Sequence, residues 1–527
     1  MHRTNCRAVG FLALVVGTGW LFPAWAAIAQ STPPGVVIDH WSANTGQYVG
    51  SPSIAVLPDG AYVASHDLFG PASDRRTTLV FISRDRGASW SPQGRIDGQW
   101  WSSLFVLDGA LYIIGPNREF GQLVIRRSTD EGRTWTDPTD PTTGLLASGK
   151  YHCAPTPVVE YRGLIWRAFG DENGRRLFMV SAPADANLLY ADNWTRTGAL
   201  VVSKQWLGGK VDDLEEGNCV VAPDGQVVDV LRVDGSPPGG EKAAIVHFSG
   251  DYRQAIFDPD SDFVDFPGGH KKFTIRFDPV SQRYWSLVNW IPPQFAGGNV
   301  NLTRNTLALV QSRDLRTWTI RCVVLQHPDR GHHAFQYADW LFDGDDLIAV
   351  SRTAYDDDSG GANSAHNANY LTFHRIRHFR DLTMKDSVSA GQPAAIQFSN
   401  GDLKLCGNQF EIATLNTNSQ AFNNRNYVWD SIPDRFIGWK YTRSSGGVRA
   451  EIQVTAIHDT ILYAATAEIQ TGIDTVGWEK MPGVFLRYTD RHRTTLSVFS
   501  RKLKAGDVLQ VAQGNWSGMI VLLPPAN

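Results

Sequence analysis

Residues 51–67 read SPSIAVLPDGAYVASHD, an apolar strand that runs into a turn and at once into a second strand. The same pattern recurs at intervals of roughly 50 residues, enough for four short strands in each repeat. The other turns lie in SSLFVLDG (102–109), APTPVVEYRG (154–163), GNCVVAPDG (217–225), FTIRFDPVSQ (273–282) and YADWLFDG (337–344). Repeated sheets of this kind bury their faces by stacking on one another. The sequence therefore predicts an all-β fold that begins with a six- or seven-bladed β-propeller over residues 36–383.

Two of these repeats end in the motif S-x-D-x-G-x-x-W, at residues 83–90 and 128–135. The Asp can cap its own turn, the Gly permits a positive φ angle, and the Trp can pack between sheets. Ser312, Asp314 and Trp318 form a third copy that lacks the Gly. Because such motifs lie on outer hairpins, we assign them to the fold and not to chemistry.

The first 29 residues have the pattern of an export signal. Arg3 and Arg7 precede the apolar run 11–20, and Ala27 and Ala29 offer small residues for cleavage. We therefore expect a secreted or periplasmic protein, with no membrane span because no later stretch reaches about 18 apolar residues. A net charge of −4 gives no electrostatic basis for binding nucleic acid. Four cysteines follow residue 29 without any C-x-x-C pair, so we expect no zinc ribbon.

The repeat ends near residue 383. Residues 384–425 are rich in Ser, Asn, Gln and Gly, which predicts a linker, and alternating apolar segments resume over 426–527. Several short strands separated by turns predict a C-terminal β-sandwich, which we interpret as an accessory domain. Its tryptophans are candidates for stacking on sugar rings or for its own core, and they are Trp439, Trp478 and Trp516.

Polar residues recur where the first strand of each repeat begins and where the second ends, positions that line the central funnel of a propeller. Together they predict a cationic bowl suited to a sugar with a carboxylate, because arginine binds carboxylates bidentately. The candidate catalytic residues are His66, Tyr151, His152 and Arg167. The candidate substrate-binding residues are Arg118, Arg232, His270, Lys271, His333, Tyr337 and Arg352. Glu215 and Glu216 lead into the fourth repeat, and we assign them no role.

The motifs resemble the sialidase-like propeller proteins with BNR repeats, or Asp boxes. The resemblance covers residues 36–383 and rests on GSPSIAVLPDGAYVASHD (50–67), HCAPTPVVEYRGLIWRA (152–168) and HAFQYADWLFDGDDLIAVSRTAYDD (333–357), together with the two motifs above. Within that superfamily the chain looks most like the propeller enzymes that act on L-rhamnose-α-1,4-D-glucuronate ends, both lyases and α-L-rhamnosidases. The propeller ulvan lyases are more distant relatives.

The resemblance also implies roles for individual residues. The family's histidine in the first blade matches His66, its tyrosine and arginine within one later blade match Tyr151 and Arg167, and a further carboxylate-binding arginine matches Arg232. The chain departs from the lyases in the second blade, where they carry another histidine and this sequence has WWS (100–102) and Asn-Arg (117–118).

A true sialidase is a different case. Those enzymes use three arginines on the sialate carboxylate and a Tyr/Glu nucleophile pair. The first of the arginines lies in an Arg-Ile-Pro run, where this chain reads YVGSP (48–52). The departure disfavours a sialidase.

We therefore expect an enzyme that cleaves a glycosidic bond beside a uronic acid in an oligo- or polysaccharide. In a lyase, Arg167 and Arg232 neutralise the uronate carboxylate, and Tyr151 or His66 removes the C5 proton. In a hydrolase, of the α-L-rhamnosidase or exo-sialidase type, His66 assists water or a substrate hydroxyl. A non-catalytic glycan-binding propeller is the third alternative. We expect a monomer that requires no metal or other cofactor, with a structural calcium ion left open.

Overall fold

The computed structural model describes residues 33–525, except 172–174, 236–239, 389–395, 409, 424, 445, 447–449, 468–472, 474 and 514–517. The described chain is all-β, with antiparallel sheets and only short helical turns. No helix within these residues is long and apolar enough to cross a membrane. The expected export signal, residues 1–29, lies outside the described residues. The helical turns are η1 (Ala43–Thr45), η2 (Ala191–Asn193), α1 (Trp206–Gly209), η3 (Pro293–Phe295), η4 (Met384–Asp386) and η5 (Asp434–Phe436).

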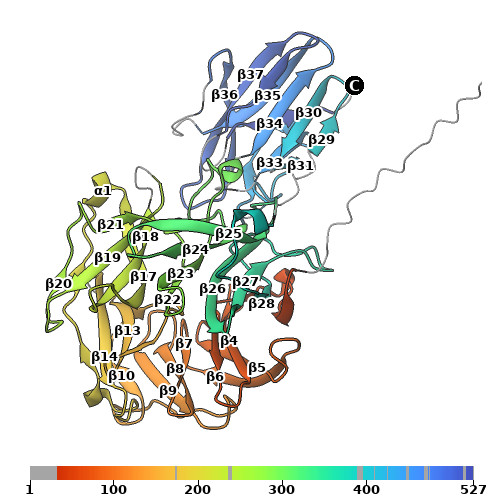
Figure 1. Cartoon of the computed structure of the whole chain (residues 1–527). Coiled ribbons are helices and arrows are strands. Elements are labelled where there is room, and N and C mark those ends of the chain that lie inside the picture. Colours follow the sequence, from red (N-terminus) through yellow and green to blue (C-terminus); the bar gives the residue numbers. More distant parts are fainter. Residues whose placement is uncertain are drawn as a thin grey trace, which may run out of the picture.

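Six antiparallel sheets follow one another along residues 36–376 (Figure 1). The first contains β2 (Tyr48–Val49), β3 (Ser53–Val56), β4 (Tyr62–Phe69), β5 (Thr77–Ser83) and β6 (Ser91–Asp97). The second contains β7 (Ser103–Leu107), β8 (Ala110–Pro116), β9 (Leu123–Ser128) and β10 (Leu145–Ala147). The third contains β11 (Tyr151–His152), β12 (Val159–Tyr161), β13 (Leu164–Asp171), β14 (Arg176–Pro183), β15 (Thr195–Arg196) and β16 (Leu200–Val201).

The next three sheets repeat the arrangement. The fourth contains β17 (Val211–Val221), β18 (Val227–Gly235), β19 (Lys242–Phe248), β20 (Ala255–Ile256) and β21 (Phe263–Asp265). The fifth contains β22 (Thr274–Asp278), β23 (Arg283–Val288), β24 (Thr306–Ser312) and β25 (Trp318–Gln326). The sixth contains β26 (Ala334–Asp343), β27 (Asp346–Ala354), β28 (Tyr370–Ile376) and β1 (Val36–His40). Since β1 pairs with β28, the start of the described chain completes the last of the six sheets.

A central cavity shows how the six sheets are arranged. It measures about 710 Å³ and is lined by residues of β3, β7, β12, β17, β22 and β26, one strand from each sheet. We call these six the inner strands. Sheets that each contribute one strand to a shared axial cavity have the arrangement of a β-propeller.

A ring of buried hydrogen bonds joins each sheet to the next at this axis. Its six polar side chains lie at or just before the start of an inner strand or within it, and each bonds to a neighbouring sheet. They are Ser53, Ser103, Thr156, Asn218, Thr274 and Asp339. The bonds are Ser53 Oγ to Asp339 Oδ2 (2.9 Å), Leu104 N to Ser53 Oγ (3.0 Å), Ser103 Oγ to Thr156 O (2.8 Å), Thr156 Oγ1 to Gly217 O (2.7 Å), Ile275 N to Asn218 Oδ1 (3.0 Å) and Thr274 Oγ1 to Ala338 O (3.1 Å). The ring therefore closes on itself.

Apolar side chains fill the spaces between neighbouring sheets. Between the sixth and the first, for example, Val350 and Phe373 pack with Val49 and Phe81. The S-x-D-x-G-x-x-W motif at residues 83–90 adds its Trp90 to this cluster, 5.5 Å from the ring of Phe373. Gly87 has a φ of 89°, and a Cβ there would lie 2.2 Å from Phe373, so only glycine fits the turn. The motif thus acts in sheet packing.

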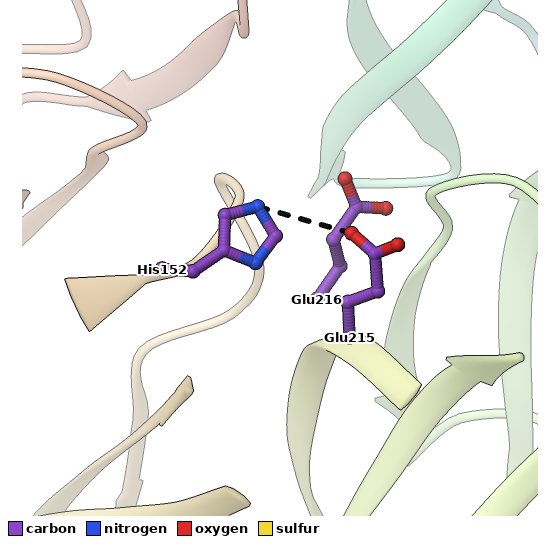
Figure 2. A group of neighbouring side chains, drawn as sticks. All are labelled: His152, Glu215 and Glu216. Atoms are coloured by element: carbon purple, nitrogen blue, oxygen red, sulfur yellow. Dashed lines mark ion pairs between the residues drawn. The ribbon is translucent and has the colours of Figure 1, made fainter. Parts of the chain in front are cut away.

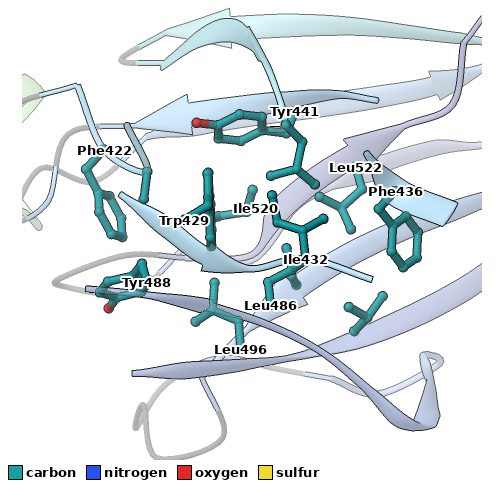
Figure 3. Close-up of a cluster of buried hydrophobic side chains, with 14 of the residues drawn as sticks. Phe422, Trp429, Ile432, Phe436, Tyr441, Leu486, Tyr488, Leu496, Ile520 and Leu522 are labelled. Atoms are coloured by element: carbon teal, nitrogen blue, oxygen red, sulfur yellow. The ribbon is translucent and has the colours of Figure 1, made fainter. Parts of the chain in front are cut away.

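Two further sheets follow residue 395. One contains β29 (Ile396–Ser399), β30 (Leu403–Asn408), β34 (Glu451–Ala456) and β38 (Val508–Gln510). The other contains β31 (Phe410–Thr414), β33 (Lys440–Ser444), β39 (Ile520–Leu523), β35 (Thr460–Thr466), β37 (Thr495–Leu503), β36 (Glu479–Tyr488) and β32 (Trp429–Ser431). One apolar cluster combines residues of both sheets, and a second, drawn in Figure 3, centres on Trp429.

This part of the chain differs from expectation in one respect. Residues 384–425, expected to be a linker, contain β29, β30 and β31, because their polar side chains alternate with apolar ones that enter the cores. Trp439 and Trp478 are partly buried and pack against the apolar clusters, as the alternative of a core role predicts, while Trp516 lies outside the described residues.

From the ring of hydrogen bonds we expect that removing one of its side chains lowers the free energy of unfolding. Replacing Asn218 with Ala leaves the buried Ile275 N–H without its acceptor, so we expect the free energy of unfolding to fall by about 1–3 kcal/mol in urea denaturation. The matched control is Asn193→Ala, which removes an exposed hydrogen bond to Asn187 O and should change stability by less than about 0.5 kcal/mol. Equal effects of the two substitutions would show that the ring is not needed for stability.

Candidate active site

Two equivalent β-bulges place Glu216 and Tyr337 at the same end of their inner strands. The register shifts within 215–218 of β17 and within 336–339 of β26, so each strand carries one extra residue relative to its partner. The bulged residues, Glu216 and Tyr337, both have a φ of 56°, in the left-handed region that non-glycine residues rarely adopt. A bulge turns a side chain away from the direction that the strand alternation would give it.

The two bulged side chains meet. Tyr337 Oη donates a hydrogen bond of 2.8 Å to Glu216 Oε1, although the residues are 121 positions apart in the sequence. Burial by itself would raise the pKa of Glu216, but the charges of Arg232 and His152 and the bond from Tyr337 lower it below its usual value. Burial raises the pKa of Tyr337 to about 12. A neutral phenol therefore faces a carboxylate that can accept its proton.

Three buried arginines surround this pair. Arg232 Nη1 lies 3.1 Å from Glu216 Oε2 and holds that carboxylate. Arg304 and Arg352 place their guanidinium carbons 5.6 and 5.3 Å from the centre of the Tyr337 ring. Burial lowers the pKa of both, that of Arg352 to about 10.

Arg304 and Arg352 are held by neutral partners. Arg304 donates to Gln336 Oε1 at 2.6 Å, and Arg352 donates to the carbonyl oxygen of His366. Within the part of the chain that the structure describes, neither forms an ion pair with a carboxylate within 4.0 Å. A buried guanidinium without an acidic partner is costly, so the two arginines favour the binding of an external anion beside Tyr337.

Glu215 and His152 lie next to Glu216 (Figure 2). His152 Nε2 lies 3.8 Å from Glu215 Oε2, and both residues line a cavity of about 230 Å³ together with Phe120. Burial raises the pKa of Glu215 to about 7, helped by neighbouring carboxylates and opposed by Arg232. The ring of Trp101 meets the ring of His152 edge-on at 4.5 Å, so an aromatic surface lies next to the carboxylates of Glu215 and Glu216.

His152, Glu215 and Glu216 place three ligand-type atoms within 4.8 Å of one another, the one such group among the described residues. Arg232 already supplies positive charge there, at 3.1 Å from Glu216 and 4.0 Å from Glu215. A divalent cation would have to occupy the same space against that repulsion. We therefore assign no metal to the trio.

His66, which we expected to be catalytic, does not reach the site. Its side chain has no exposed surface and stacks on Phe81 at 5.7 Å. Its Nε2 lies 2.8 Å from Asp39 Oδ2 and its Nδ1 2.9 Å from Asp67 O, so both ring nitrogens are engaged. Because Asp39 belongs to β1, His66 fastens the closing strand to the first sheet.

Tyr151 and Arg167 are also placed in the interior and not in the funnel. Tyr151 is 8% exposed and packs in the apolar cluster between the second and third sheets. Arg167 is fully buried and donates to Thr156 Oγ1, Ala154 O and Ala168 O. Arg167 thus positions a member of the hydrogen-bond ring. Both expectations are corrected, and of the four expected catalytic residues only His152 adjoins the site.

The expected substrate-binding residues divide into two groups. Three of them belong to the site: Arg232 and Tyr337 contact Glu216, and Arg352 lies beside the Tyr337 ring. His270 contacts the site only through its carbonyl oxygen, which accepts a hydrogen bond from Arg232 Nε. The remaining three lie elsewhere: Arg118 is exposed on a loop, Lys271 pairs with Glu241, and His333 pairs with Asp329 and Asp356. The site residues that the sequence analysis left without a role are Glu215, Glu216 and Arg304.

No protein-family model and no curated protein matches the chain. Among solved structures, an α-L-arabinanase from Penicillium chrysogenum is 15% identical and covers 66% of this chain and 98% of its own, with a TM-score of 0.42. An α-L-arabinofuranosidase from Fusarium graminearum is 13% identical, with 67% and 99% covered and a TM-score of 0.44. The Hadza microbial sialidase Hz136 is 12% identical, with 64% and 67% covered and a TM-score of 0.43.

The position of His66 leads to a prediction about stability. His66→Ala removes the buried link to Asp39, so we expect the free energy of unfolding to fall by about 2–4 kcal/mol. Turnover per folded molecule should stay unchanged on any glycoside that the unaltered protein cleaves. Thermal unfolding and kcat are measured on the same preparations, with the exposed His458→Ala as control. A stable His66→Ala protein without activity would restore His66 as a catalytic residue.

Proposed function

We propose that this protein is a glycoside hydrolase acting on a sugar that bears a carboxylate, with Tyr337 as the nucleophile and Glu216 as its base. The observation that carries the proposal is the 2.8 Å hydrogen bond from Tyr337 to Glu216 among three arginines. The expected lyase residues His66, Tyr151 and Arg167 are buried in structural contacts, so the geometry supports the hydrolase alternative better.

The proposed chemistry follows from the protonation of the pair. Glu216 is anionic and takes the phenolic proton as Tyr337 Oη attacks the anomeric carbon, which forms a covalent glycosyl intermediate. Water then releases the sugar with its anomeric configuration retained. A neutral phenol approaches a sugar with a carboxylate more easily than a carboxylate nucleophile does, because two like charges would repel.

The substrate class follows from the arginines. Arg232 is engaged by Glu216, whereas Arg304 and Arg352 form no ion pair with a carboxylate within 4.0 Å among the described residues. A carboxylate on the sugar would accept charge-assisted hydrogen bonds from these two groups. Trp101 and Phe120, close to His152, offer ring surface to the rest of an oligosaccharide.

We also infer that the six sheets are the six blades of a sialidase-like propeller, and that the two C-terminal sheets form a β-sandwich. The closed ring of hydrogen bonds and the shared central cavity support the first inference. The apolar cluster common to both C-terminal sheets supports the second. We keep the expectation that residues 1–29 direct export.

The nucleophile is tested with Tyr337→Phe. Loss of the phenolic oxygen should lower kcat by about 10³-fold or more, since the covalent step can no longer occur. Glu216→Gln should cause a similar loss. Tyr151→Phe is the matched control and should keep kcat within about twofold, because Tyr151 lies in a structural cluster.

The substrates for this test are 4-methylumbelliferyl glycosides of N-acetylneuraminate and of glucuronate, followed by fluorescence. Mass spectrometry of the products separates the reaction classes, because hydrolysis adds one water and β-elimination does not. An unsaturated product, or an active Tyr337→Phe protein, would overturn the proposed function.

The anion site is tested with Arg352→Met. Loss of a charge-assisted hydrogen bond to the substrate carboxylate should lower kcat/KM by about 10- to 100-fold, with a rise in KM. The loss should be smaller on the methyl ester of the same substrate, which carries no charge. Arg118→Met, at an exposed loop position, should have no effect. Equal losses on acid and ester would contradict a carboxylate site.

A further inference from the structure

The reaction needs a second group that neither Tyr337 nor Glu216 supplies. The glycosidic oxygen leaves as an alcohol only if an acid gives it a proton, and water attacks the intermediate only if a base then removes one. A group with a pKa near 7 can do both at neutral pH. In the described chain, burial raises the pKa of three carboxyls to about 7, those of Asp67, Asp229 and Glu215.

Two of these three carboxyls are inaccessible to a substrate. Asp67 and Asp229 are each 1% exposed. Both oxygens of Asp67 are engaged, one by Thr78 Oγ1 at 2.7 Å and the other by Trp101 N at 2.8 Å. The side chain of Glu215 is 22% exposed and lines the cavity of about 230 Å³. Only Glu215 therefore lies where a glycosidic oxygen can reach it.

The bulge explains why Glu215 and Glu216 serve the same opening. Consecutive residues of a regular strand point to opposite faces of the sheet. Here the extra residue within 215–218 breaks that alternation, and both side chains leave the strand on the same side, next to His152 (Figure 2). Their nearest ligand-type oxygens lie within 4.8 Å of each other and of His152. A substrate held against Tyr337 would thus meet the base Glu216 and, within 4.8 Å of that base, the accessible acid Glu215.

We propose that Glu215 is the general acid–base of this hydrolase and that His152 is its positioning residue, an inference that rests on the proposed function above. In the first step Glu215 gives its proton to the glycosidic oxygen as the C–O bond breaks, while Tyr337 Oη bonds to the anomeric carbon and its own proton passes to Glu216. In the second step Glu215 takes a proton from water, whose oxygen bonds to the anomeric carbon as the bond to Tyr337 breaks. Tyr337 then recovers its proton from Glu216, and all three groups return to their starting state.

His152 holds the acid without contacting the reacting atoms. Its Nε2 lies 3.8 Å from Glu215 Oε2, and its ring packs against Trp101 at 4.5 Å and Phe120 at 5.8 Å, two rings that also contact each other. An imidazole packed against two aromatic rings keeps its position, and its ion pair to Glu215 favours one placement of that carboxyl. Geometry of this kind matters because proton transfer falls steeply when donor and acceptor move apart.

The charges around Glu215 determine the pH dependence. Burial and neighbouring carboxylates favour its protonated form, and the guanidinium of Arg232 favours the anion. The groups that face it are Arg232, Glu216, Asp234, Asp213 and His152. Because the first step needs the proton, kcat/KM should decline as the pH rises through about 7.

The first test compares two leaving groups in Glu215→Gln. On an alkyl glycoside, whose alcohol needs a proton to leave, kcat should fall by about 10²- to 10⁴-fold. On the 4-methylumbelliferyl glycoside, whose phenol leaves unaided, the first step should be nearly unchanged, so a burst of one equivalent precedes slow turnover. Sodium azide, which needs no base, should restore the slow step. The matched control is the exposed neighbour Asp212→Asn, which should behave as the unaltered protein.

The second test measures pH profiles. On the alkyl glycoside, whose leaving group needs the proton, the decline in kcat/KM near pH 7 should disappear in Glu215→Gln. In His152→Ala we expect kcat to fall about tenfold with KM unchanged. The pH at which kcat/KM declines on the alkaline side should also shift. If His152 had only a structural role, the substitution would lower the stability of the protein and leave the pH of this decline unchanged.

The outcomes separate the two proposals. If Tyr337→Phe is inactive but Glu215→Gln loses activity equally on both leaving groups, or not at all, Glu215 is not the acid and the proposed function stands. If Tyr337→Phe is active, the proposed function itself fails. If EDTA removes the activity and added Zn²⁺ or Ca²⁺ restores it, His152, Glu215 and Glu216 hold a metal, and the assignment of Glu215 is overturned.

Discussion

The ring of buried hydrogen bonds around the axis is the constraint on which the rest of the molecule depends. Each of its six side chains satisfies a polar group of a neighbouring inner strand in a place where water cannot. A strand that slid along the axis by one residue would lose its bonds to both neighbours. The ring therefore fixes all six inner strands at the same depth, and equivalent positions of different sheets lie at the same end of the cavity.

The bulges of the fourth and sixth sheets depend on this fixed depth. Asn218 and Asp339 are ring members, and the bulged residues Glu216 and Tyr337 each lie two positions before them. Because the hydrogen bonds of the ring hold Asn218 and Asp339 in place, the extra residue in each strand bulges out on the N-terminal side of the ring position. The left-handed backbone of both residues costs on the order of 1 kcal/mol each, which the buried contacts around them offset. The site is built from this displacement.

The sequence predicts the repeat of strands and three residues of the site, but not the directions in which the side chains point. The strand–turn–strand repeat can be predicted from the sequence, because its turns contain Gly, Pro or Asp and its buried strands contain apolar residues. Arg232, Tyr337 and Arg352 follow from the same repeat, since they occupy the expected ends of strands. His66 and Arg167 occupy similar positions in the pattern, yet they face the interior and bond to β1 and to the ring.

Two features of the site leave no trace in the pattern of residues. A bulge changes the face of the sheet on which a residue lies. The sequences around Glu216 and Tyr337 nevertheless resemble those at the start of any other strand of the repeat. Arg304 lies in the loop before β24, outside the repeat, so only the folded chain brings it to Tyr337. The segment 384–425 shows the converse difficulty, because a composition typical of a linker also fits short strands with one polar face.

One guanidinium distinguishes the two adjacent carboxylates of the bulge. Arg232 Nη1 lies 3.1 Å from Glu216 and 4.0 Å from Glu215, and Glu216 alone also accepts a hydrogen bond from Tyr337. The nearer group is stabilised as an anion, and its charge then helps to keep a proton on the farther one. Neighbouring carboxyls with pKa values moved in opposite directions are what separate base and acid roles require at a single pH. A single extra residue in β17 thus brings the two carboxyls together, and Arg232 makes them chemically different.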